Sequence, residues 1–405
     1  MSLRPYQQEA LEAIKKDLSV SGASIVCLPM GSGKSHVIAE TATLAHTVLI
    51  LQPSTELVIQ NKEKLLRLVD EKDIGVFCAT AGKREVRKFT FATIQSVYKK
   101  PERFKDVDLI IIDECHAVGV TDLYGMFTRF LAHFPNVKVF GFTATPFRID
   151  TVYERKQGML FARTGIKMIN RMRNKKVTTP FWKRIIYTVP HQRMVDEKYL
   201  VPLTYIHEPL VPYEHIPVNV SHSDFNLQGY SEMIIGMESN ILNTISEAQK
   251  RYTSVLVFCA DVPQAARLSE IVKGSGFVTG ATKPLARKML IEKFKNGEIK
   301  TLFNVSVLTT GFDHPQLDCI ILLRPVRSPL LYLQMLGRGS RTVDGKTTCT
   351  VIDFTGSCKA LGSIESFEIF QKDGWQWDVR SEKVDGFHGK ILFTMQIENK
   401  NHARI

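Results

Sequence analysis

The feature that most constrains the fold is a repeated pattern of short apolar runs, each of which ends in a polar or glycine-rich turn and leads into helical spacing. Such a pattern is typical of βα units around a parallel sheet. Four runs precede residue 150 and four follow residue 240: residues 24–28, 48–51, 107–112 and 137–142, then 255–258, 301–305, 320–323 and 350–352. We therefore expect an α/β fold with two tandem parallel-sheet lobes.

A chain of 405 residues is also longer than one hydrophobic core normally supports, since single cores stop growing near ~250–300 residues. Four prolines between residues 202 and 217 indicate an extended crossover between the lobes. We expect four segments: a first lobe over residues 1–150, a basic insertion and inter-lobe linker over 151–240, a second lobe over 241–365, and a small β-rich extension over 366–405.

The positive charge is concentrated in one short stretch. The formal net charge is +12, and residues 151–200 carry twelve Lys and Arg against three Asp and Glu, or +9 of it. Aromatic residues are interleaved with these cations, which suits a polyanion whose bases can stack. The alternative is a solvated basic face of a helical insertion. The nucleic-acid candidates in this stretch are Arg171, Arg173, Lys175 and Lys176.

Composition excludes several other classes of protein. Apolar residues make up 44% and charged residues 23%, as in globular domains rather than disordered or collagen-like chains. No run approaches the ~18 apolar residues of a membrane helix, and the first residues lack a signal-peptide pattern, so we expect a cytoplasmic protein without membrane association. The seven cysteines form no CxxC pair, which argues against a structural zinc site.

A glycine-rich loop follows the first apolar run and precedes a helical pattern. It reads Pro29-Met30-Gly31-Ser32-Gly33-Lys34-Ser35. Glycines let the backbone N–H groups and the helix N-terminus face a phosphate. Lys34 would then reach the β/γ-phosphates of ATP, and the Ser35 hydroxyl would hold Mg²⁺. The strict GxxxxGK[ST] pattern fails because Leu28 occupies the first glycine position.

Two acids lie where a phosphate loop needs them. The run over residues 107–112 delivers Asp113, Glu114 and His116 at its carboxyl end, which is where ligands bind to parallel sheets. Asp113 would bind the Mg²⁺ shell, Glu114 would orient and deprotonate a water, and His116 would sense this state. Taken alone, such a pair is more often a solvated strand end.

Two arginines in the second lobe would complete the site. Arg338 and Arg341 lie three residues apart on a predicted helix, so both can point into one cleft. An arginine brought against the γ-phosphate from another lobe can contribute ~10³–10⁵ in rate. By themselves two arginines near a glycine are weak evidence.

In order along the chain, these segments resemble the full motif series of superfamily 2 DExH-type helicases. The segments that carry the resemblance are residues 3–7, 29–35, 52–57, 93–96, 113–116, 143–146, 257–259, 309–313 and 334–341. In that family the phosphate loop begins with a residue other than glycine, which accounts for Leu28. The finer resemblance is to the bacterial RadD DNA-repair helicases. RadD-type proteins continue into a cysteine-rich zinc-binding region that is missing here, which favours a compact relative of phage or mobile-element origin.

The resemblance implies two RecA-like lobes and assigns roles at matching positions. The implied contacts to ATP are Arg4, Gln7, Met30, Gly31, Ser32, Gly33, Gly311 and Asp313, with Gln334 beside the γ-phosphate arginines. Thr143 and Thr145 would couple hydrolysis to strand movement. The implied contacts to the nucleic-acid backbone are Pro53, Ser54, Thr93, Gln95, Ser96, Thr309 and Thr310. Ordinary turn and helix capping is the alternative for these polar residues.

The sequence thus predicts an ATP- and Mg²⁺-dependent DNA helicase or translocase acting on single-stranded, forked or branched DNA in repair, recombination or replication. We expect a monomer in a bacterial or phage-infected cell, with single-strand-binding or recombination proteins as partners. An RNA helicase is one alternative. A DNA-binding clamp that ATP merely orders is another, although the presence of Lys34, Glu114 and Arg341 argues against it.

Overall fold

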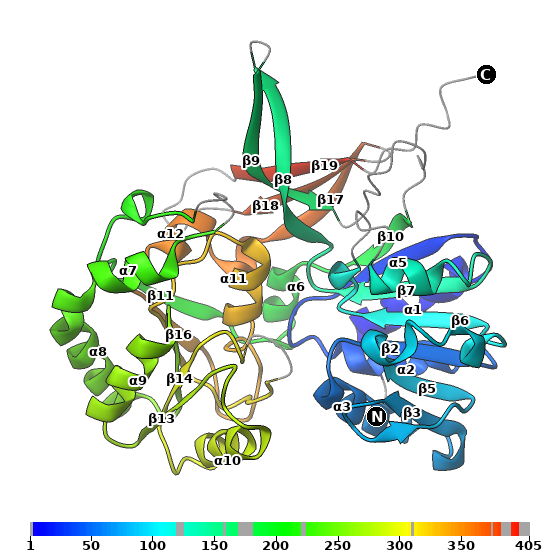
Figure 1. The fold of residues 1–405 in the computed structure, drawn as a ribbon, viewed down its shortest axis with the longest axis horizontal. Helices are drawn as coiled ribbons and strands as arrows, with labels where there is room; N and C mark the ends of the chain where they lie inside the picture. The colour runs from blue at the N-terminus through cyan, green and yellow to red at the C-terminus, as the bar shows by residue number, and fades with distance from the viewer. Residues whose placement is uncertain are drawn as a thin grey trace.

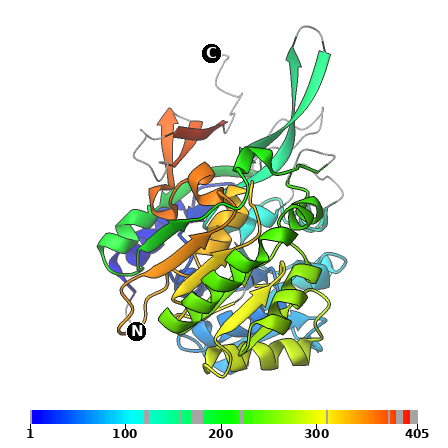
Figure 2. The same cartoon turned by 90° about the vertical axis from the view of Figure 1, so that its left-hand side faces the viewer.

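The computed structural model describes residues 3–118, 125–156, 159–168, 181–219, 224–308, 312–373, 376–381 and 390–396. Two α/β lobes lie side by side, and a hairpin and a small sheet rise above them (Figures 1 and 2). The predicted fold class is confirmed, because both lobes are built on parallel sheets.

Lobe 1 is built on an eight-stranded sheet. Its strands, in spatial order, are β10 (Trp182–Thr188), β1 (Ala23–Cys27), β7 (Lys138–Thr143), β6 (Leu109–Asp113), β2 (Val48–Gln52), β5 (Phe89–Thr93), β3 (Ile74–Cys78) and β4 (Lys83–Arg84). All pairs are parallel except β3 with β4. The helices of this lobe are α1 (Pro5–Asp17), α2 (Lys34–Ala42), α3 (Thr55–Leu65), α4 (Ile94–Val97) and α5 (Met126–Leu131).

The central strands of lobe 1 are buried on both faces. In β2, Leu49 and Leu51 belong to one hydrophobic cluster, whereas Val48 and Ile50 belong to another. This two-sided burial explains why the strand reads as a continuous apolar run in the sequence.

Lobe 2 is built on a six-stranded sheet in which every pair is parallel. Its strands, in spatial order, are β11 (Leu203–His207), β16 (Cys349–Asp353), β15 (Cys319–Leu322), β12 (Val255–Phe258), β14 (Thr301–Asn304) and β13 (Ser275–Val278). The helices around it are α7 (Leu227–Met233), α8 (Glu238–Arg251), α9 (Val262–Ile271), α10 (Pro284–Lys295), α11 (Pro329–Leu336) and α12 (Ser357–Leu361). Helix α6 (His191–Asp196) lies between the two lobes (Figure 1).

The region expected to form only an insertion and a linker also completes both sheets. Strand β10 pairs with β1 at the edge of lobe 1, and β11 pairs with β16 at the edge of lobe 2. The expectation of an extended crossover therefore fails at β11. Both are edge strands with several half-buried or exposed positions, so neither reads as a continuous apolar run.

The remaining described strands form two small antiparallel units. A long hairpin consists of β8 (Phe147–Lys156) and β9 (Met159–Met168), and it projects away from both lobes (Figures 1 and 2). The C-terminal extension is β-rich, as expected, and forms a three-stranded sheet of β17 (Glu368–Asp373), β18 (Gln376–Ser381) and β19 (Lys390–Gln396). Arg171, Arg173, Lys175 and Lys176 lie outside the described residues.

A charged cluster ties the edge strand β10 to lobe 1. The carboxylate of Asp17, at the end of α1, accepts hydrogen bonds from Arg184 Nε at 2.6 Å, Lys138 Nζ at 2.6 Å and Ser24 Oγ at 2.5 Å. Asp17 is 7% exposed, so both cations depend on it for their charge balance. Breaking such a pair leaves uncompensated charge away from bulk water.

We therefore expect Asp17→Ala to destabilise lobe 1 by about 2–4 kcal/mol, somewhat below the cost of breaking a fully buried pair because the Arg184 side chain is 28% exposed. Urea unfolding of the purified protein measures this change. Glu12→Ala removes an exposed carboxylate paired with Lys15 on the same helix and serves as the control. Equal midpoints for the two variants would contradict the proposed importance of the cluster.

Candidate functional site

The glycine loop, residues 29–35, joins β1 to α2 and is held from below by α1. Gly31 and Gly33 have φ values of 78° and 75°, in the left-handed region that favours glycine. The carbonyl oxygen of Ser32 accepts hydrogen bonds from the Tyr6 hydroxyl at 2.5 Å and from Gln7 Nε2 at 3.0 Å. A Cβ at Gly33 would lie 2.9 Å from the same Gln7 nitrogen. The loop is thus fixed in shape with its other side open to a cavity.

The acid pair lies directly across from this loop. Asp113 ends β6, and Glu114 follows with a φ of 48°, which is unusual for a residue other than glycine. Strain of this kind persists where surrounding structure imposes it, often at functional sites. Asp113 accepts hydrogen bonds from Asn61 Nδ2 at 3.3 Å and from the Glu114 N–H at 2.9 Å. Lys34 Nζ lies 3.5 Å from Glu114 Oε1, so the predicted lysine and acid meet.

The two neighbouring acids have opposite pKa shifts. Burial, and then the negative charge of Glu114, raise the pKa of Asp113 to about 7. Burial alone would also raise the pKa of Glu114, but the positive charges of Lys34 and Arg338 outweigh it and hold that pKa below its usual value. Environments that shift the pKa values of two paired acids in opposite directions are typical of sites that hold or move protons.

A short polar relay leads away from Glu114. His116 Nδ1 lies 3.3 Å from Glu114 Oε2 and 2.9 Å from Thr143 Oγ1. The Thr143 hydroxyl oxygen in turn accepts a hydrogen bond from the Thr145 N–H at 3.0 Å. Burial lowers the pKa of His116, which favours the neutral imidazole. Of the two predicted coupling residues, Thr143 therefore contacts His116 directly, and Thr145 is joined to it through Thr143.

Lobe 2 brings its two arginines against the glycine loop. Arg338 and Arg341 both donate to the Phe312 carbonyl oxygen, at 2.6 Å and 2.9 Å, and Arg341 also pairs with the Asp313 carboxylate. A Cβ at Gly31 would lie 3.2 Å from Arg341 Cγ, and one at Gly337 would lie 2.6 Å from Met30 Cβ. The lobes thus touch at the loop, and glycines permit the approach.

These groups line one cavity of about 480 Å³ between the lobes. Its volume lies in the range of small-molecule sites, roughly 300–1,000 Å³. The cavity is lined by the following residues from both lobes: Arg4, Pro29, Met30, Gly31, Gly33, Lys34, Ser35, His36, Leu57, Gln60, Asn61, Glu63, Lys64, Asp113, Glu114, Tyr199, Phe312, Asp313, Pro315, Arg338, Arg341 and Thr342.

The donor set suits a nucleotide with a divalent cation. Lys34, Arg338 and Arg341 offer cationic donors for phosphate oxygens, and the N-terminus of the nine-residue helix α2 follows the loop. Ser35 and Asp113 offer a hydroxyl and a carboxylate, the hard oxygen ligands that Mg²⁺ prefers. Among the described residues, no group of three or more His, Cys, Asp or Glu is placed to hold a metal ion.

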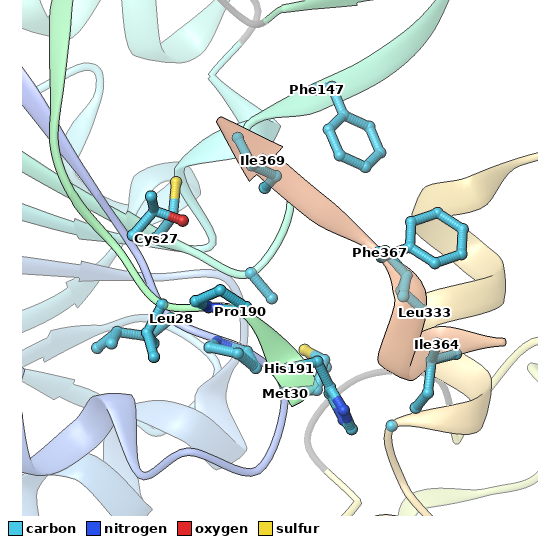
Figure 3. Close-up of a pocket in the computed structure, with 15 residues that line it drawn as sticks. Cys27, Leu28, Met30, Phe147, Pro190, His191, Leu333, Ile364, Phe367 and Ile369 are labelled. Carbon is cyan, nitrogen blue, oxygen red and sulfur yellow. The ribbon is translucent and has the colours of Figure 1, made fainter. Parts of the chain in front are cut away.

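A second, apolar pocket lies on the other side of Met30 (Figure 3). Residues from several parts of the chain line it, among them Cys27 and Leu28 of lobe 1, Leu333 of lobe 2, and Phe367 and Ile369 beside and within β17. Its volume is about 50 Å³, enough for a few waters. The C-terminal extension therefore packs at the junction of the lobes, behind the glycine loop.

The His191 ring also lines this apolar pocket. His191 is 7% exposed, and within the described part of the chain neither of its ring nitrogens has a hydrogen-bond partner. Burial lowers the pKa of His191 to about 4, so the ring is neutral at physiological pH. A water in the pocket would satisfy it.

Several predicted residues lie away from the nucleotide cavity. Gln7 braces the glycine loop, and its Oε1 accepts from the Arg4 N–H at 3.0 Å, so its amide is already engaged. Gln334 is buried on α11 and is not among the cavity residues. Thr309, Thr310 and Gly311 lie outside the described residues.

The predicted nucleic-acid residues of lobe 1 follow β2 and β5. Ser54 caps α3 by accepting from the Leu57 N–H at 3.3 Å. The Thr93 and Ser96 hydroxyls lie 2.9 Å apart, and Ser96 also accepts from the Ala79 N–H at 3.0 Å. Gln95 is exposed and Pro53 is half-buried. The capping alternative thus holds for Ser54, and the role of this group in binding stays a prediction.

Three residues at the site are assigned no role from the sequence. Asn61 reaches Asp113 from α3, and Phe312 supplies the carbonyl that holds both arginines. Tyr199 lines the cavity with the Arg4 guanidinium 4.8 Å from its ring centroid. Asn61 and Tyr199 belong to no predicted motif and reach the site through the packing of distant segments, whereas Phe312 lies within the predicted motif at 309–313 and acts through its backbone.

Comparison with known proteins agrees with this geometry. Residues 1–148 match the family described as "Type III restriction enzyme, res subunit", and residues 238–343 match the helicase conserved C-terminal domain. The two matches correspond to the two lobes. Lobe 1 is therefore similar to the first of these families, and lobe 2 is similar to the second.

Among its relatives is a Saccharomyces cerevisiae protein, IRC3, whose name describes an ATP-dependent helicase. It is 28% identical over 97% of this chain and 58% of its own length. The DNA 3'-5' translocase XPB2 of Sulfurisphaera tokodaii is 24% identical over 85% of the chain and 80% of its own length. This chain thus spans just over half of the yeast relative.

A solved structure shares the fold. It is the ATP-dependent Type ISP restriction-modification enzyme LlaBIII bound to DNA, with a TM-score of 0.60 and 16% identity over 87% of this chain and 28% of that one. The resemblance to RadD-type helicases stays a prediction. None of the helices in the described ranges is long and apolar enough to cross a bilayer.

The raised pKa of Asp113 predicts a pH-dependent cost to folding. Ionising Asp113 is unfavourable in the folded state, so this cost grows as pH rises from its unfolded pKa near 4 to about 7 and is then constant. We expect Asp113→Asn to raise the melting temperature of the nucleotide-free protein, more at pH 8 than at pH 5.5.

Thermal unfolding of wild type and variant across this range measures the effect. Asp70→Asn, which changes an exposed carboxylate, is the control and should be pH-independent over the same interval. Equal stabilisation by Asp113→Asn at both pH values would contradict a pKa of about 7 for the buried Asp113 carboxyl.

Proposed function

We propose that this protein is an ATP-driven motor that moves along DNA. The observation that carries the proposal is the convergence of Lys34 and Glu114 from lobe 1 with Arg338 and Arg341 from lobe 2 on one cavity. A site divided in this way can couple the state of a nucleotide to the separation of the lobes.

Each residue has a role that follows from its surroundings. Lys34 and the backbone N–H groups of the glycine loop would hold the β/γ-phosphates. Glu114 is ionised at neutral pH because its pKa is lowered, so it can orient a water and accept its proton. Arg4, within the chain's first motif, forms a cation–aromatic pair with Tyr199, and the two would contact the base.

The arginines have to change partners during the reaction. In this structure they are bound to the Phe312 carbonyl and the Asp313 carboxylate. Phosphate oxygens would compete for the same donors, and charge-assisted bonds to phosphate are strong. Ser35 and Asp113 would hold Mg²⁺, which neutralises phosphate charge when it is bound.

The relay from Glu114 through His116 to Thr143 would pass the state of the site to the nucleic acid. His116 contacts Glu114 and Thr143, so a change of charge at Glu114 changes the electrostatic field at the His116 ring. The segment after Thr143 leads directly into the hairpin β8–β9. We infer that hydrolysis thereby shifts the grip on one strand.

DNA is the proposed substrate because relatives are named DNA translocases and helicases. Single-stranded, forked or branched DNA in repair, recombination or replication, as the RadD resemblance implies, is the finer proposal. RNA remains the second candidate, since only contacts to the 2′-hydroxyl separate the two substrates. A non-hydrolysing clamp is disfavoured by the presence of every residue that hydrolysis requires.

Nucleic-acid-stimulated ATP hydrolysis tests the proposal. We expect single-stranded or forked DNA to stimulate hydrolysis more than matched RNA, and Glu114→Gln to abolish the stimulated rate while ATP still binds. A steady-state phosphate-release assay with each nucleic acid measures this. Hydrolysis that no nucleic acid changes would favour the clamp, and stronger stimulation by RNA would favour the RNA helicase.

The basic stretch is proposed as a second contact to DNA. The hairpin follows β7 and precedes β10, so this segment leaves lobe 1 at the β10 edge of the sheet. Strand β2 ends just before Pro53, and strand β5 ends at Thr93. Both strands lie on the other side of the central strand β6. A DNA strand bound along β2 and β5 would therefore not occupy the basic stretch, which could bind a neighbouring duplex or branch.

Neutralising Arg171, Arg173, Lys175 and Lys176 with Gln should weaken binding to forked DNA more than binding to a single strand. The slope of log K against log[salt] for forked DNA should fall by roughly 0.9 per lost phosphate contact in a duplex. Fluorescence anisotropy at several salt concentrations measures both quantities. An unchanged slope and affinity would show that this stretch does not contact DNA.

A further inference from the structure

Lys346, which lies outside every predicted motif, joins the loop that carries Arg338 and Arg341 to the neighbouring segment, residues 312–315. Lys346 Nζ donates hydrogen bonds to the carbonyl oxygens of Pro315 at 2.9 Å, Gly339 at 2.6 Å and Arg341 at 2.9 Å. An ammonium group has three donors. All three are used, and all three acceptors are backbone carbonyls.

The acceptors belong to two segments that also meet at the cavity. Residues 312–315 overlap the end of the predicted motif at 309–313, and residues 338–341 carry Arg338 and Arg341. On the cavity side the segments are joined by the bonds from the arginines to the Phe312 carbonyl. Lys346 joins the same two segments through different atoms.

The two ties respond differently to a nucleotide. If the arginines turn to phosphate, their bonds to the Phe312 carbonyl and the Asp313 carboxylate are lost. The bonds of Lys346 involve no group that has to move. Among the polar contacts of the described residues, the three bonds of Lys346 would then still join the two segments while the arginines are bound to phosphate.

We propose that Lys346 is a positioning residue that holds the backbone of the arginine loop in place so that Arg338 and Arg341 reach the terminal phosphate. This inference rests on the proposed function, because it assumes that the arginines bind that phosphate. Lys346 itself lines no part of the nucleotide cavity. It acts through the arginines.

Loss of the tie should affect the closed, reactive state more than nucleotide capture. Lobe 1 supplies the glycine loop and Lys34, so ADP binding should change little in Lys346→Met. A misplacement of about 1 Å can cost roughly 10²-fold in rate. We therefore expect kcat to fall roughly 10–100-fold, with KM for ATP within about threefold of wild type.

A binding measurement separates positioning from activity. The preference for ADP with beryllium fluoride, which mimics the terminal phosphate, over ADP alone is determined by calorimetry for wild type, Lys346→Met, Arg341→Ala and the double variant. We expect Lys346→Met to reduce this preference roughly tenfold and to add nothing further in the Arg341→Ala background, because the two act as a unit.

Lys300→Met is the matched control. Lys300 also lies in lobe 2 and donates to a backbone carbonyl, that of Gln249 at 3.2 Å, but it ties no segment of the site. Should Lys346→Met melt at a lower temperature than this control, Lys346→Gln replaces it with the same expected loss of preference, because its shorter side chain is polar but has two N–H donors for the three carbonyls.

The outcomes are distinct. An unchanged preference in the Lys346 variants beside a reduced one in Arg341→Ala would overturn the inference and leave the proposed function standing. An unchanged preference in Arg341→Ala would show that this arginine does not bind the terminal phosphate, and both would then fail. Equal effects of the Lys346 and Lys300 variants would show a general loss of lobe 2 stability and would also overturn it.

Discussion

The contact between the two lobes at the glycine loop is the constraint on which the rest of the site depends. Gly337 packs on Met30 at a distance that leaves no room for a Cβ, and Arg341 packs beside Gly31, whose left-handed backbone favours glycine. This approach brings a cationic pair from one lobe to a lysine and an acid pair from the other. Lobe 1 holds Lys34 and the carboxylate that could activate a water, and only lobe 2 supplies the two arginines.

Charge balance explains how so many ionisable groups remain in one cavity. Glu114 lies between Lys34 and the His116 ring, and its negative charge is offset by Arg338 as well. Asp113 carries no comparable compensation, so its pKa rises. A cation bound beside Asp113 would reverse this and favour the ionised carboxylate, because nearby positive charge lowers the pKa of an acid. The site is therefore built to be more stable when loaded.

The sequence reveals those parts of the molecule that depend on residues close together in the chain. The eight apolar runs all coincide with strands to within two residues, because central parallel strands are buried on both faces and leave a continuous apolar signature. Edge strands β10 and β11 leave none, so the sequence does not reveal that residues 151–240 add a strand to each sheet. Lys34, Asp113 and Arg341 are visible because their chemistry requires fixed spacing. Asn61, Tyr199 and Lys346 are not, because only tertiary packing brings them to the site.

The most direct test of the account is a structure of the protein with ADP, beryllium fluoride and Mg²⁺. We predict that Lys34, Arg338 and Arg341 all contact the fluoride that replaces the terminal phosphate, and that both arginines have left the Phe312 carbonyl. Nucleotide bound by lobe 1 alone, with Arg341 still paired to Asp313, would contradict a site shared between the lobes.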